Sequence, residues 1–488
     1  MPAEAQDNIS SSCNGNTATG NPGETATIVV VTIVQFLTPF MFSAVGVALP
    51  ALGREFSANA VQLGLIEMAY ILGVGLFLLP VGRFADIYGR KNVFISGTVV
   101  MTVSTMALAL APGIESFILF RFLQGTGAAM ITSTSLAILS CVIPAHRRGR
   151  AMGIVVSGVY IGLSAGPTLA GLMISYLGWR WIFYIAVPVE LLAMALAIWK
   201  LKGEWADARG KRFDAFGSLI YMAALFALII GVTQLKAMPE AKWMAMAGLG
   251  GLLFFLFYES KNDSPIIDVG LLTTNRAFTL SNAATLINYA ASFGVVFFFS
   301  IYLQTIRGIP PKTAGLILVV QPVIQALLAP LAGRLSDIRP PARIATVGMG
   351  LCAAGLAVAA CITADTPLLV IFVVLILLGI GFGFFSTPNT AAIMASVPPV
   401  YYGTASSLLA TMRAMGMLIS MTIITVLLSV FMGRQPITPE TGTAFITTMR
   451  WSLMVFALMS VAGIACSLGR IAPRPVHRGS SEPPNGLG

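Results

Sequence analysis

Four charged side chains lie within long apolar stretches of the sequence: Glu67, Arg121, Glu190 and Arg413. A charge in the hydrocarbon core of a membrane costs several kcal/mol unless it is paired or hydrated, so such a residue is a candidate for function. A carboxyl group that is removed from water can take up and release protons near neutral pH. Glu67 and Glu190, together with Arg121 as a cation in the same region, are therefore the predicted proton-coupling groups.

Each of these residues also has a structural interpretation. Glu67 and Glu190 could form inert buried pairs or stay protonated. Arg121 could extend its long side chain to the membrane surface instead of facing a cavity. Arg413 lies within a few turns of a helix end, so both interpretations remain open for it.

Residues that bind metals or act as nucleophiles are scarce. The two histidines, His146 and His477, fall in a basic loop and in the C-terminal tail. The five cysteines are odd in number and include no Cys-x-x-Cys pair, which argues against a disulfide framework and a metal site. No phosphate-binding Gly-x-x-x-x-Gly-Lys-Ser/Thr motif occurs. We therefore expect no enzyme activity, no metal and no other cofactor.

The composition explains where these charges must reside. Hydrophobic residues make up 57% of the 488 residues and charged residues only 10%, with a mean hydropathy of +0.86. Such a chain would expose apolar surface in water, whereas a membrane span needs about 20 mostly apolar residues. We predict an all-α integral membrane protein with about fourteen transmembrane helices. The predicted helices are 27–50, 63–82, 92–112, 115–140, 150–175, 180–200, 214–235, 243–260, 277–305, 312–333, 343–363, 368–395, 403–431 and 450–470.

The positive charges set the predicted orientation. Most of the 29 lysines and arginines fall in loops on the side of the N-terminus, which places both termini in the cytoplasm of a multi-pass plasma (inner) membrane protein. The net charge of +10 is spread over these loops and forms no stripe, so we expect no nucleic-acid partner. Residues 1–26 lack the basic start of a signal peptide, and they and residues 471–488 are predicted to be disordered cytoplasmic tails.

A short sequence occurs twice. Gly82-Arg-Phe-Ala-Asp86 follows the second predicted helix, and Gly333-Arg-Leu-Ser-Asp337 follows the tenth. Internal repeats of this kind are typical of secondary transporters. We predict two pseudo-symmetric six-helix bundles separated by a linker and two inserted helices. The predicted ranges are 27–200 for the first bundle, 201–260 for the linker and insert, and 261–470 for the second bundle.

The first copy of the repeat has a possible mechanical role. A carboxylate such as Asp86 at the membrane surface can contact the positive N-terminal end of another helix. We expect that end near Tyr402–Gly403, so that the contact would close the inner side; alternatively, the loop only enforces topology. The predicted gating residues are Gly82, Asp86, Gly89, Arg90 and Lys91.

Small residues recur on one predicted helix, at Gly162, Gly166, Pro167 and Gly171. Small side chains let helices approach closely in lipid, and an internal proline loosens its helix. The pattern favours a helix that changes its packing during a conformational cycle, with plain tight packing as the alternative.

These motifs resemble those of a known family. Residues 82–94 look like the loop 2–3 signature of the major facilitator superfamily, and residues 119–129 resemble its helix 4 motif. Residues 162–171 resemble the helix 5 motif that is associated with antiporters. Residues 178–183 and Arg413 also resemble the fourteen-helix drug:proton antiporter branch, and the resemblance extends from about residue 30 to 470.

The sequence departs from that branch in two places. Met41 stands where the branch usually has a helix 1 aspartate, and Gly46 stands where it has an asparagine. Ala186 replaces another asparagine. The resemblance therefore leaves Glu67 and Glu190 as the candidates for the proton carrier.

The resemblance implies a substrate cavity between helices 1, 4, 9 and 12. Apart from Thr38, its candidate residues are aromatic, amide-bearing or sulfur-containing, which suits apolar or amphipathic ligands. The candidates are Gln35, Thr38, Met41, Phe42, Gln124, Asn282, Asn288, Tyr289, Phe293, Tyr302, Phe385 and Asn389.

The implied function is efflux of hydrophobic or amphipathic small molecules in exchange for protons, by alternating access, by a chain that we expect to be monomeric in the lipid bilayer. The alternative of the same fold is a proton-coupled importer or exporter of a small metabolite. An enzyme would need a nucleophile–base or metal cluster, and a channel would not need the repeat and the Gly/Pro-rich helix.

Overall fold

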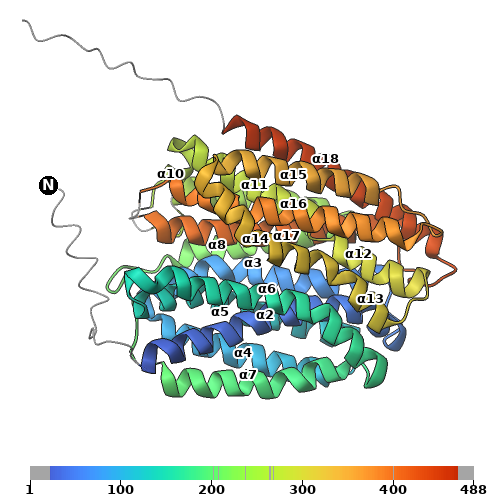
Figure 1. The fold of residues 1–488 in the computed structure, drawn as a ribbon, viewed down its shortest axis with the longest axis horizontal. Coiled ribbons are helices and arrows are strands. Elements are labelled where there is room, and N and C mark those ends of the chain that lie inside the picture. Colours follow the sequence, from blue (N-terminus) through green and yellow to red (C-terminus); the bar gives the residue numbers. More distant parts are fainter. Residues whose placement is uncertain are drawn as a thin grey trace, which may run out of the picture.

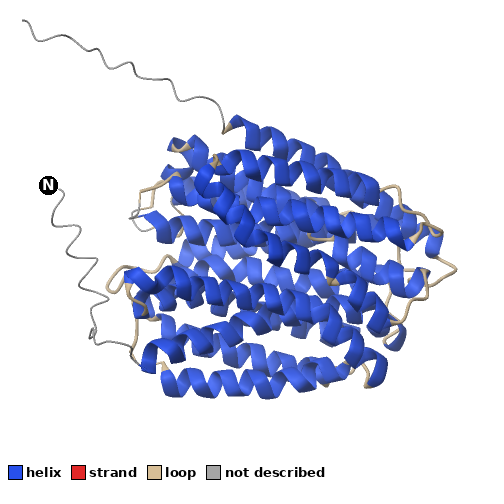
Figure 2. Ribbon diagram, viewed as in Figure 1, coloured by secondary structure: helices blue, strands red, loops and turns tan. Residues whose placement is uncertain are grey.

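The computed structural model describes residues 22–470 except 202, 207, 237, 263–264, 268 and 399–400. The described chain consists of long helices joined by short loops at both ends of the molecule (Figure 2). It contains 14 helical spans that are long and apolar enough to cross a membrane, as predicted. The predicted tail 471–488 lies outside the described residues.

The first half of the chain forms one bundle, in the lower part of Figure 1. Within it, α2 packs along α6, α3 packs along α5, and α4 packs on α5 and α7. Its helices are α2 (Pro22–Glu55), α3 (Ala60–Tyr88), α4 (Arg90–Ala109), α5 (Ile114–Val142), α6 (Ala145–Tyr176) and α7 (Arg180–Lys200).

The last part of the chain forms the second bundle, in the upper part of Figure 1. Here α15 packs on α16 and α18, and α11 packs on α17 and α18. Its helices are α10 (Val269–Thr274), α11 (Arg276–Ser292), α12 (Val295–Ile301), the π-helical turn η1 (Tyr302–Ile306), α13 (Pro311–Leu318), α14 (Val320–Ile338), α15 (Pro341–Ala359), α16 (Leu368–Ala395), α17 (Tyr402–Phe431) and α18 (Gly442–Gly469).

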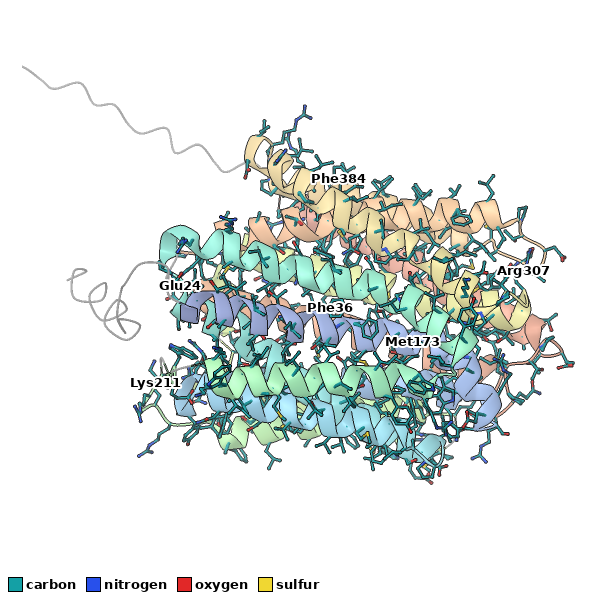
Figure 3. The ribbon with its side chains drawn as sticks, turned by 60° about the horizontal axis from the view of Figure 1, so that its bottom comes forward. Glu24, Phe36, Met173, Lys211, Arg307 and Phe384 are labelled. Carbon is teal, nitrogen blue, oxygen red and sulfur yellow. The ribbon has the colours of Figure 1, made fainter. Side chains whose placement is uncertain are left out.

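Both described chain ends lie at the same end of the molecule (Figure 1). Glu24 and Lys211 lie at that end, and Arg307 lies at the opposite end (Figure 3). We call the first the terminal end and the second the far end.

Several helix boundaries differ from the predicted ones. α2 begins at Pro22, so residues 22–26 are helical rather than part of a tail; Glu24 in the first turn pairs with Arg147 at 3.2 Å. α18 begins at Gly442, eight residues before the predicted start, because its first turns pack into the bundle: Phe445 is buried against Phe298, with ring centroids 6.0 Å apart. Predicted spans 277–305 and 312–333 are each broken, into α11, α12 and η1 and into α13 and α14.

The inserted pair, α8 (Ala215–Thr233) and α9 (Ala241–Glu259), is anchored to both bundles. The Tyr221 hydroxyl donates to the carbonyl of Gly75 on α3 at 2.8 Å. Lys236 donates to the carbonyls of Ser429 and Val430 near the end of α17, at 2.9 and 2.8 Å. α9 packs chiefly on α8, so the second inserted helix is held through the first.

The close packing of α8 and α9 predicts different effects for two glycines of α9. A Cβ on Gly248 would overlap the backbone of Leu228, whereas Gly250 has no atom within 4 Å of that position. Gly248→Val should therefore destabilise the insert by about 1–3 kcal/mol, the usual cost of overpacking. Gly250→Val is the matched control. Thermal unfolding in detergent should show a lower midpoint for Gly248→Val alone; equal midpoints would contradict the packing.

Candidate functional site

A large cavity lies between the two bundles, with a volume of about 2570 Å³. Its walls come from α2, α3, α5 and α6 on one side and α11, α14, α16 and α17 on the other. Lining residues extend from Glu24 and Arg147 at the terminal end to Gly46 and Val296 deep in the molecule. A cavity of this size exceeds the roughly 300–1,000 Å³ of an ordinary ligand pocket, so it can hold a ligand together with water.

The far end is closed by contacts between the bundles. The Ser300 hydroxyl donates to the carbonyl of Gly46 at 2.7 Å, and the Gln304 amide donates to the carbonyl of Val47 at 3.0 Å. The amide of Lys312 donates to the Ser175 hydroxyl at 3.1 Å. The cavity is therefore sealed where α12, η1 and α13 meet α2 and α6.

The glycine-rich segment of α6 has two packing partners. A Cβ on Gly162 would overlap the carbonyl of Phe36 on α2, and one on Gly166 would overlap the Ser43 hydroxyl of the same helix. A Cβ on Gly171 would lie against the carbonyl of Pro311, at 2.5 Å. A Cβ on Gly315 of the facing helix α13 would likewise overlap the carbonyl of Pro167 on α6. Part of the motif thus holds the first bundle together, and part of it belongs to the far-end closure.

The three predicted proton-coupling groups lie in one buried chain of polar contacts. Arg121 on α5 donates to Glu67 on α3 at 3.2 Å and to Gln124 at 2.8 Å. Gln124 donates to the Thr105 hydroxyl on α4 at 2.9 Å, and Thr105 donates to Glu190 on α7 at 3.1 Å. The chain of contacts crosses the first bundle, and Arg121 is 0% exposed, so its side chain does not reach the membrane surface.

Only one end of this chain reaches the cavity. Glu67 and Tyr70 line the cavity, whereas Glu190 does not. One oxygen of Glu67, Oε1, has no hydrogen-bond partner among the described residues, and a Cβ on Gly46 would lie 3.8 Å from it. The ring of Tyr70 lies 4.4 Å from the Arg121 guanidinium and covers the pair. Glu67 therefore lies where the buried chain of polar contacts meets the cavity wall, and it pairs there with Arg121.

Sequence analysis missed Thr105 and Tyr70. Thr105 connects Gln124 to Glu190, and Tyr70 covers Arg121. Neither residue carries a charge, and a threonine or tyrosine in an apolar helix is common, so the sequence held no distinguishing signal for them.

The predicted gating residues contact one another and Glu204. Asp86 accepts from Arg90 at 2.9 and 2.6 Å, and the amide of Lys91 donates to Glu204 at 2.8 Å. Gly89 has a φ of 124°, which favours glycine, and a Cβ there would collide with Glu204. Glu204 was not predicted; it attaches the segment after α7 to this loop.

The predicted contact of Asp86 with the start of α17 is absent from the described contacts. Gly82, Asp86 and Arg90 on one side, and Tyr402 and Gly403 on the other, all line the cavity. The mouth of the cavity separates the two elements in this conformation. Asp337, in the second copy of the repeat, is exposed at the end of α14.

The structure divides the predicted cavity residues into two groups. Gln35, Thr38, Phe42, Tyr289 and Phe293 line the cavity. The others lie elsewhere because their helices present a different face from the predicted one. Those outside the lining are Met41, Gln124, Asn282, Asn288, Tyr302, Phe385 and Asn389.

Two of the displaced residues have other partners. The Tyr302 hydroxyl donates to the carbonyl of Thr363 at 2.7 Å, near the far end. Asn389 donates to Thr285 at 2.7 Å and accepts from Arg470, which ties α16 to α11 and to the end of α18. These contacts stabilise the second bundle.

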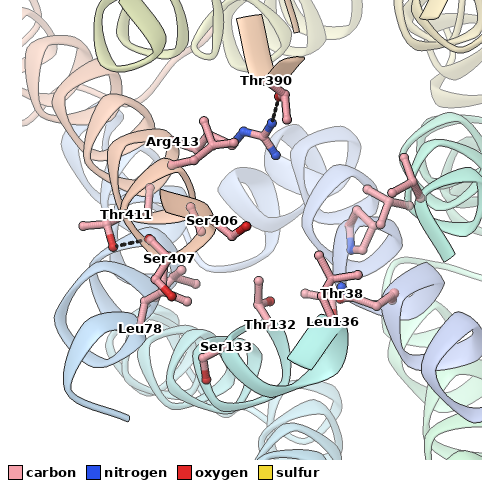
Figure 4. A pocket seen from close by; sticks show the side chains of 18 of the residues that line it. Thr38, Leu78, Thr132, Ser133, Leu136, Thr390, Ser406, Ser407, Thr411 and Arg413 are labelled. Carbon is pink, nitrogen blue, oxygen red and sulfur yellow. Dashed lines mark hydrogen bonds between the residues drawn. The ribbon is translucent and has the colours of Figure 1, made fainter. Parts of the chain in front are cut away.

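Arg413 faces the cavity. It donates to the Thr390 hydroxyl at 3.0 Å (Figure 4) and lies 5.7 Å from the centre of the Tyr289 ring. Tyr160 and Gln325 line the same cavity from α6 and α14 and were not predicted. Arg413 therefore does not extend to the membrane surface.

The family model described as Major Facilitator Superfamily matches residues 31–261 and 282–486. The riboflavin transporter RibZ of Clostridioides difficile is 30% identical over 389 residues, which cover 79% of this chain and 84% of RibZ. The multidrug resistance protein Stp of Mycobacterium tuberculosis (strain CDC 1551 / Oshkosh) is 29% identical over 440 residues, covering 88% of this chain and 80% of Stp. The tetracenomycin C resistance and export protein of Streptomyces glaucescens is 27% identical over 391 residues, 78% of this chain and 72% of that protein.

A solved structure shares the fold. The inward-facing, unoccupied crystal structure of a bacterial homologue of the human lysosomal transporter Spinster superposes with a TM-score of 0.66 at 17% identity, covering 92% of this chain and 97% of that one. Taken with the family match, the repeat motifs and the cavity between two bundles, these findings show that this chain belongs to the Major Facilitator Superfamily and is a membrane transporter, not an enzyme.

Proposed function

We propose that this chain exports hydrophobic or amphipathic small molecules in exchange for protons, by alternating access. The observation that carries this proposal is the position of Glu67: it lines the cavity and pairs with the fully buried Arg121 at 3.2 Å. When Glu67 is ionised, the pair is neutral and the first bundle is held together. When Glu67 binds a proton, Arg121 loses its ionic partner, so protonation favours a different arrangement of α3 and α5.

Glu190 is the second proton-binding group in this proposal. It connects to Arg121 only through Thr105 and Gln124, and one of its oxygens has no partner among the described residues. A change at Glu67 would reach Glu190 through these hydrogen bonds. Glu190 then responds to the state of the pair without facing the substrate.

The orientation of the chain decides which side the cavity faces. With basic loops in the cytoplasm, both termini are cytoplasmic and the cavity opens inward. The far-end contacts of α12 and α13 then form the closed outer side. In the outward-open state the far end separates, the terminal end closes, and Asp86 approaches the start of α17.

The cavity lining suits apolar and amphipathic ligands. Phe42 from the first bundle and Phe293 from the second face each other with ring centroids 5.0 Å apart, and Tyr289 packs on Phe382 at the same distance. Large apolar cavities with few polar groups bind by packing and stacking. Two of the relatives are a multidrug resistance protein and a tetracenomycin C resistance and export protein, which supports export. The similarity to a riboflavin transporter supports the alternative, an importer or exporter of a small metabolite. We place the chain in the plasma membrane as a monomer.

Proton coupling through Glu67 predicts the result of one substitution. In proteoliposomes with an imposed pH gradient, transport of a fluorescent lipophilic compound in one direction should be accompanied by a measurable flux of protons in the other. Glu67→Gln preserves the size of the side chain but cannot ionise, so it should reduce substrate-driven proton flux to the level of empty liposomes. Substrate binding should persist.

Glu440→Gln is the matched control, because Glu440 is an exposed carboxylate in the loop before α18. It should transport like the unmodified protein. If proton-coupled substrate transport persists in Glu67→Gln, a group other than Glu67 carries the proton. Movement without any proton flux in the unmodified protein would overturn the exchange mechanism.

The far-end closure predicts a second result. Gly171→Val would push α6 away from Pro311 on α13, at an overpacking cost of about 1–3 kcal/mol to the closed far end. That cost corresponds to a shift of about 5–150-fold toward the state with an open far end. Gly153→Val is the control on the same helix, because Gly153 has open space at its Cβ position.

The readout is the reaction of a cysteine at position 300 with a membrane-impermeant maleimide, in a protein whose native cysteines have been replaced. Ser300 is buried in the far-end closure. Labelling from the far side should be faster with Gly171→Val than with Gly153→Val. Equal rates would show that the contact of α6 with α13 does not hold the far end closed.

A further inference from the structure

The acidic residues of the cavity wall are all paired with arginines. Glu24, Glu67 and Asp86 are the described acidic residues that line it. Each is therefore neutralised by a neighbour and attracts no cation strongly. The pairs are Glu24–Arg147 at 3.2 Å, Glu67–Arg121 at 3.2 Å and Asp86–Arg90 at 2.6 Å.

Three arginines of the same wall, Arg83, Arg148 and Arg413, have no acidic partner among the described residues. Arg83 and Arg148 lie near the terminal end. Arg413 lies eleven residues into α17, which is about 16 Å along the helix axis. It is thus the deep, uncompensated charge of the described cavity wall.

The surroundings of Arg413 leave hydrogen-bonding capacity unused. A guanidinium group has five N–H donors in a planar fork, and the described structure gives Arg413 one hydrogen bond, to Thr390. Its Nε is buried and has no partner among the described residues. Tyr289 covers one side of the group (Figure 4 shows Arg413 and Thr390 at the cavity). A cation that faces a cavity with unused hydrogen-bond donors is suited to bind an anion there.

An aromatic surface leads from Arg413 toward the Glu67–Arg121 pair. Tyr289 lies on α11, and Phe293, the residue that follows the end of α11, lies one turn later. The ring centroids of Phe293 and Phe42 are 5.0 Å apart, and those of Phe42 and Tyr70 are 5.6 Å apart. A flat apolar ligand can pack along this surface with its polar group at one end. The spacing suits a molecule with an aromatic body and one anionic group.

We propose that Arg413 binds the carboxylate of an amphipathic aromatic anion, whose rings pack against Phe293 and Phe42. The planar fork of arginine matches the two oxygens of a carboxylate. This inference rests on the proposed function, because it names the substrate class of the same cavity. It makes Arg413 the residue that selects anionic over neutral and cationic substrates.

Three naphthalene compounds of similar size test the selection: 1-naphthaleneacetate, 2-(1-naphthyl)ethanol and 2-(1-naphthyl)ethylammonium. Calorimetric titration of the purified full chain should show that the anion binds more tightly than the alcohol by on the order of tenfold, as expected for a hydrogen-bonded charge pair. The cation should bind most weakly. Equal binding of anion and alcohol, or binding of none of the three, would overturn the proposal.

Substitutions at Arg413 test whether this residue causes the preference for the anion. Arg413→Gln should abolish the preference for the anion while the alcohol still binds, which also shows that the variant is folded. Arg413→Lys should retain part of the preference, because the charge remains but the fork is lost. Arg450→Gln removes an exposed arginine of α18 outside the cavity wall and should change nothing. A preference that persists in Arg413→Gln would overturn the proposal.

Proton flux in proteoliposomes separates this inference from the proposed function. Proton counterflow driven by the alcohol or the cation but not by the anion would support exchange and overturn the selection of anions. Selective, Arg413-dependent binding of the anion without any proton flux would support the anion site and overturn proton-coupled exchange.

Discussion

The ion pair of Glu67 and Arg121 constrains the first bundle, because it is costly to leave either buried charge without its partner. Their 3.2 Å contact requires α3 and α5 to lie very close together. Two glycines permit this: a Cβ on Gly125 would overlap the carbonyl of Tyr70, and one on Gly73 would overlap the carbonyl of Phe122. These two glycines, which in the sequence suggest only close helix packing, therefore also help to bring the carboxylate of Glu67 and the guanidinium of Arg121 together. A buried pair of this kind adds little net stability, but removing the charge of one partner leaves the other charge buried and uncompensated, which is the basis for the proposed proton dependence of the α3–α5 arrangement.

The lipid environment explains why the two bundles can separate at one end and not fall apart. Helices in a bilayer gain little from burying apolar side chains, so their association depends on close backbone approach and on hydrogen bonds between helices. α6 uses both: Gly162 and Gly166 lie against α2 within the bundle, whereas Gly171 faces α13 across the closure. The interface of α6 with α2 within the bundle is larger than its interface with α13 in the closure, which hydrogen bonds such as that of Ser300 with Gly46 supplement. In the alternating-access cycle that we propose, the smaller interface of α6 with α13 is the one that opens, and the larger interface of α6 with α2 stays intact.

The sequence predicted the number of spans, because that number depends on local composition. It also singled out Glu67 and Arg121, because a charge in lipid is costly; their role in proton coupling stays a prediction. It did not predict which face of a helix meets the cavity. Asn389 lies on α16, which is apolar almost all round, so no periodicity distinguished a cavity face from a bundle interior. Helix starts such as Gly442 of α18 depend on tertiary contacts of polar or mixed turns, which no apolar window reveals. The predicted contact of Asp86 with α17 would need the cavity mouth to close, as in the outward-open state that we propose, and it stays a prediction.

The positions of Glu67 and Arg413 provide a route by which proton and substrate can influence each other. Glu67 is on α3 and Arg413 is on α17, and these two helices pack along each other across the boundary between the bundles. Contacts are tight along this seam: a Cβ on Gly64 would lie 2.9 Å from the Thr425 hydroxyl oxygen, and one on Gly75 would lie 2.8 Å from the methyl carbon of Met415. A ligand can shift a conformational equilibrium only by its difference in affinity for the two states. If an anion at Arg413 favours one packing of α17 on α3, and ionised Glu67 favours one packing of α3 on α5, then α3 takes part in both preferences. By linkage, the proton must then change substrate affinity by the same factor by which the substrate changes proton affinity.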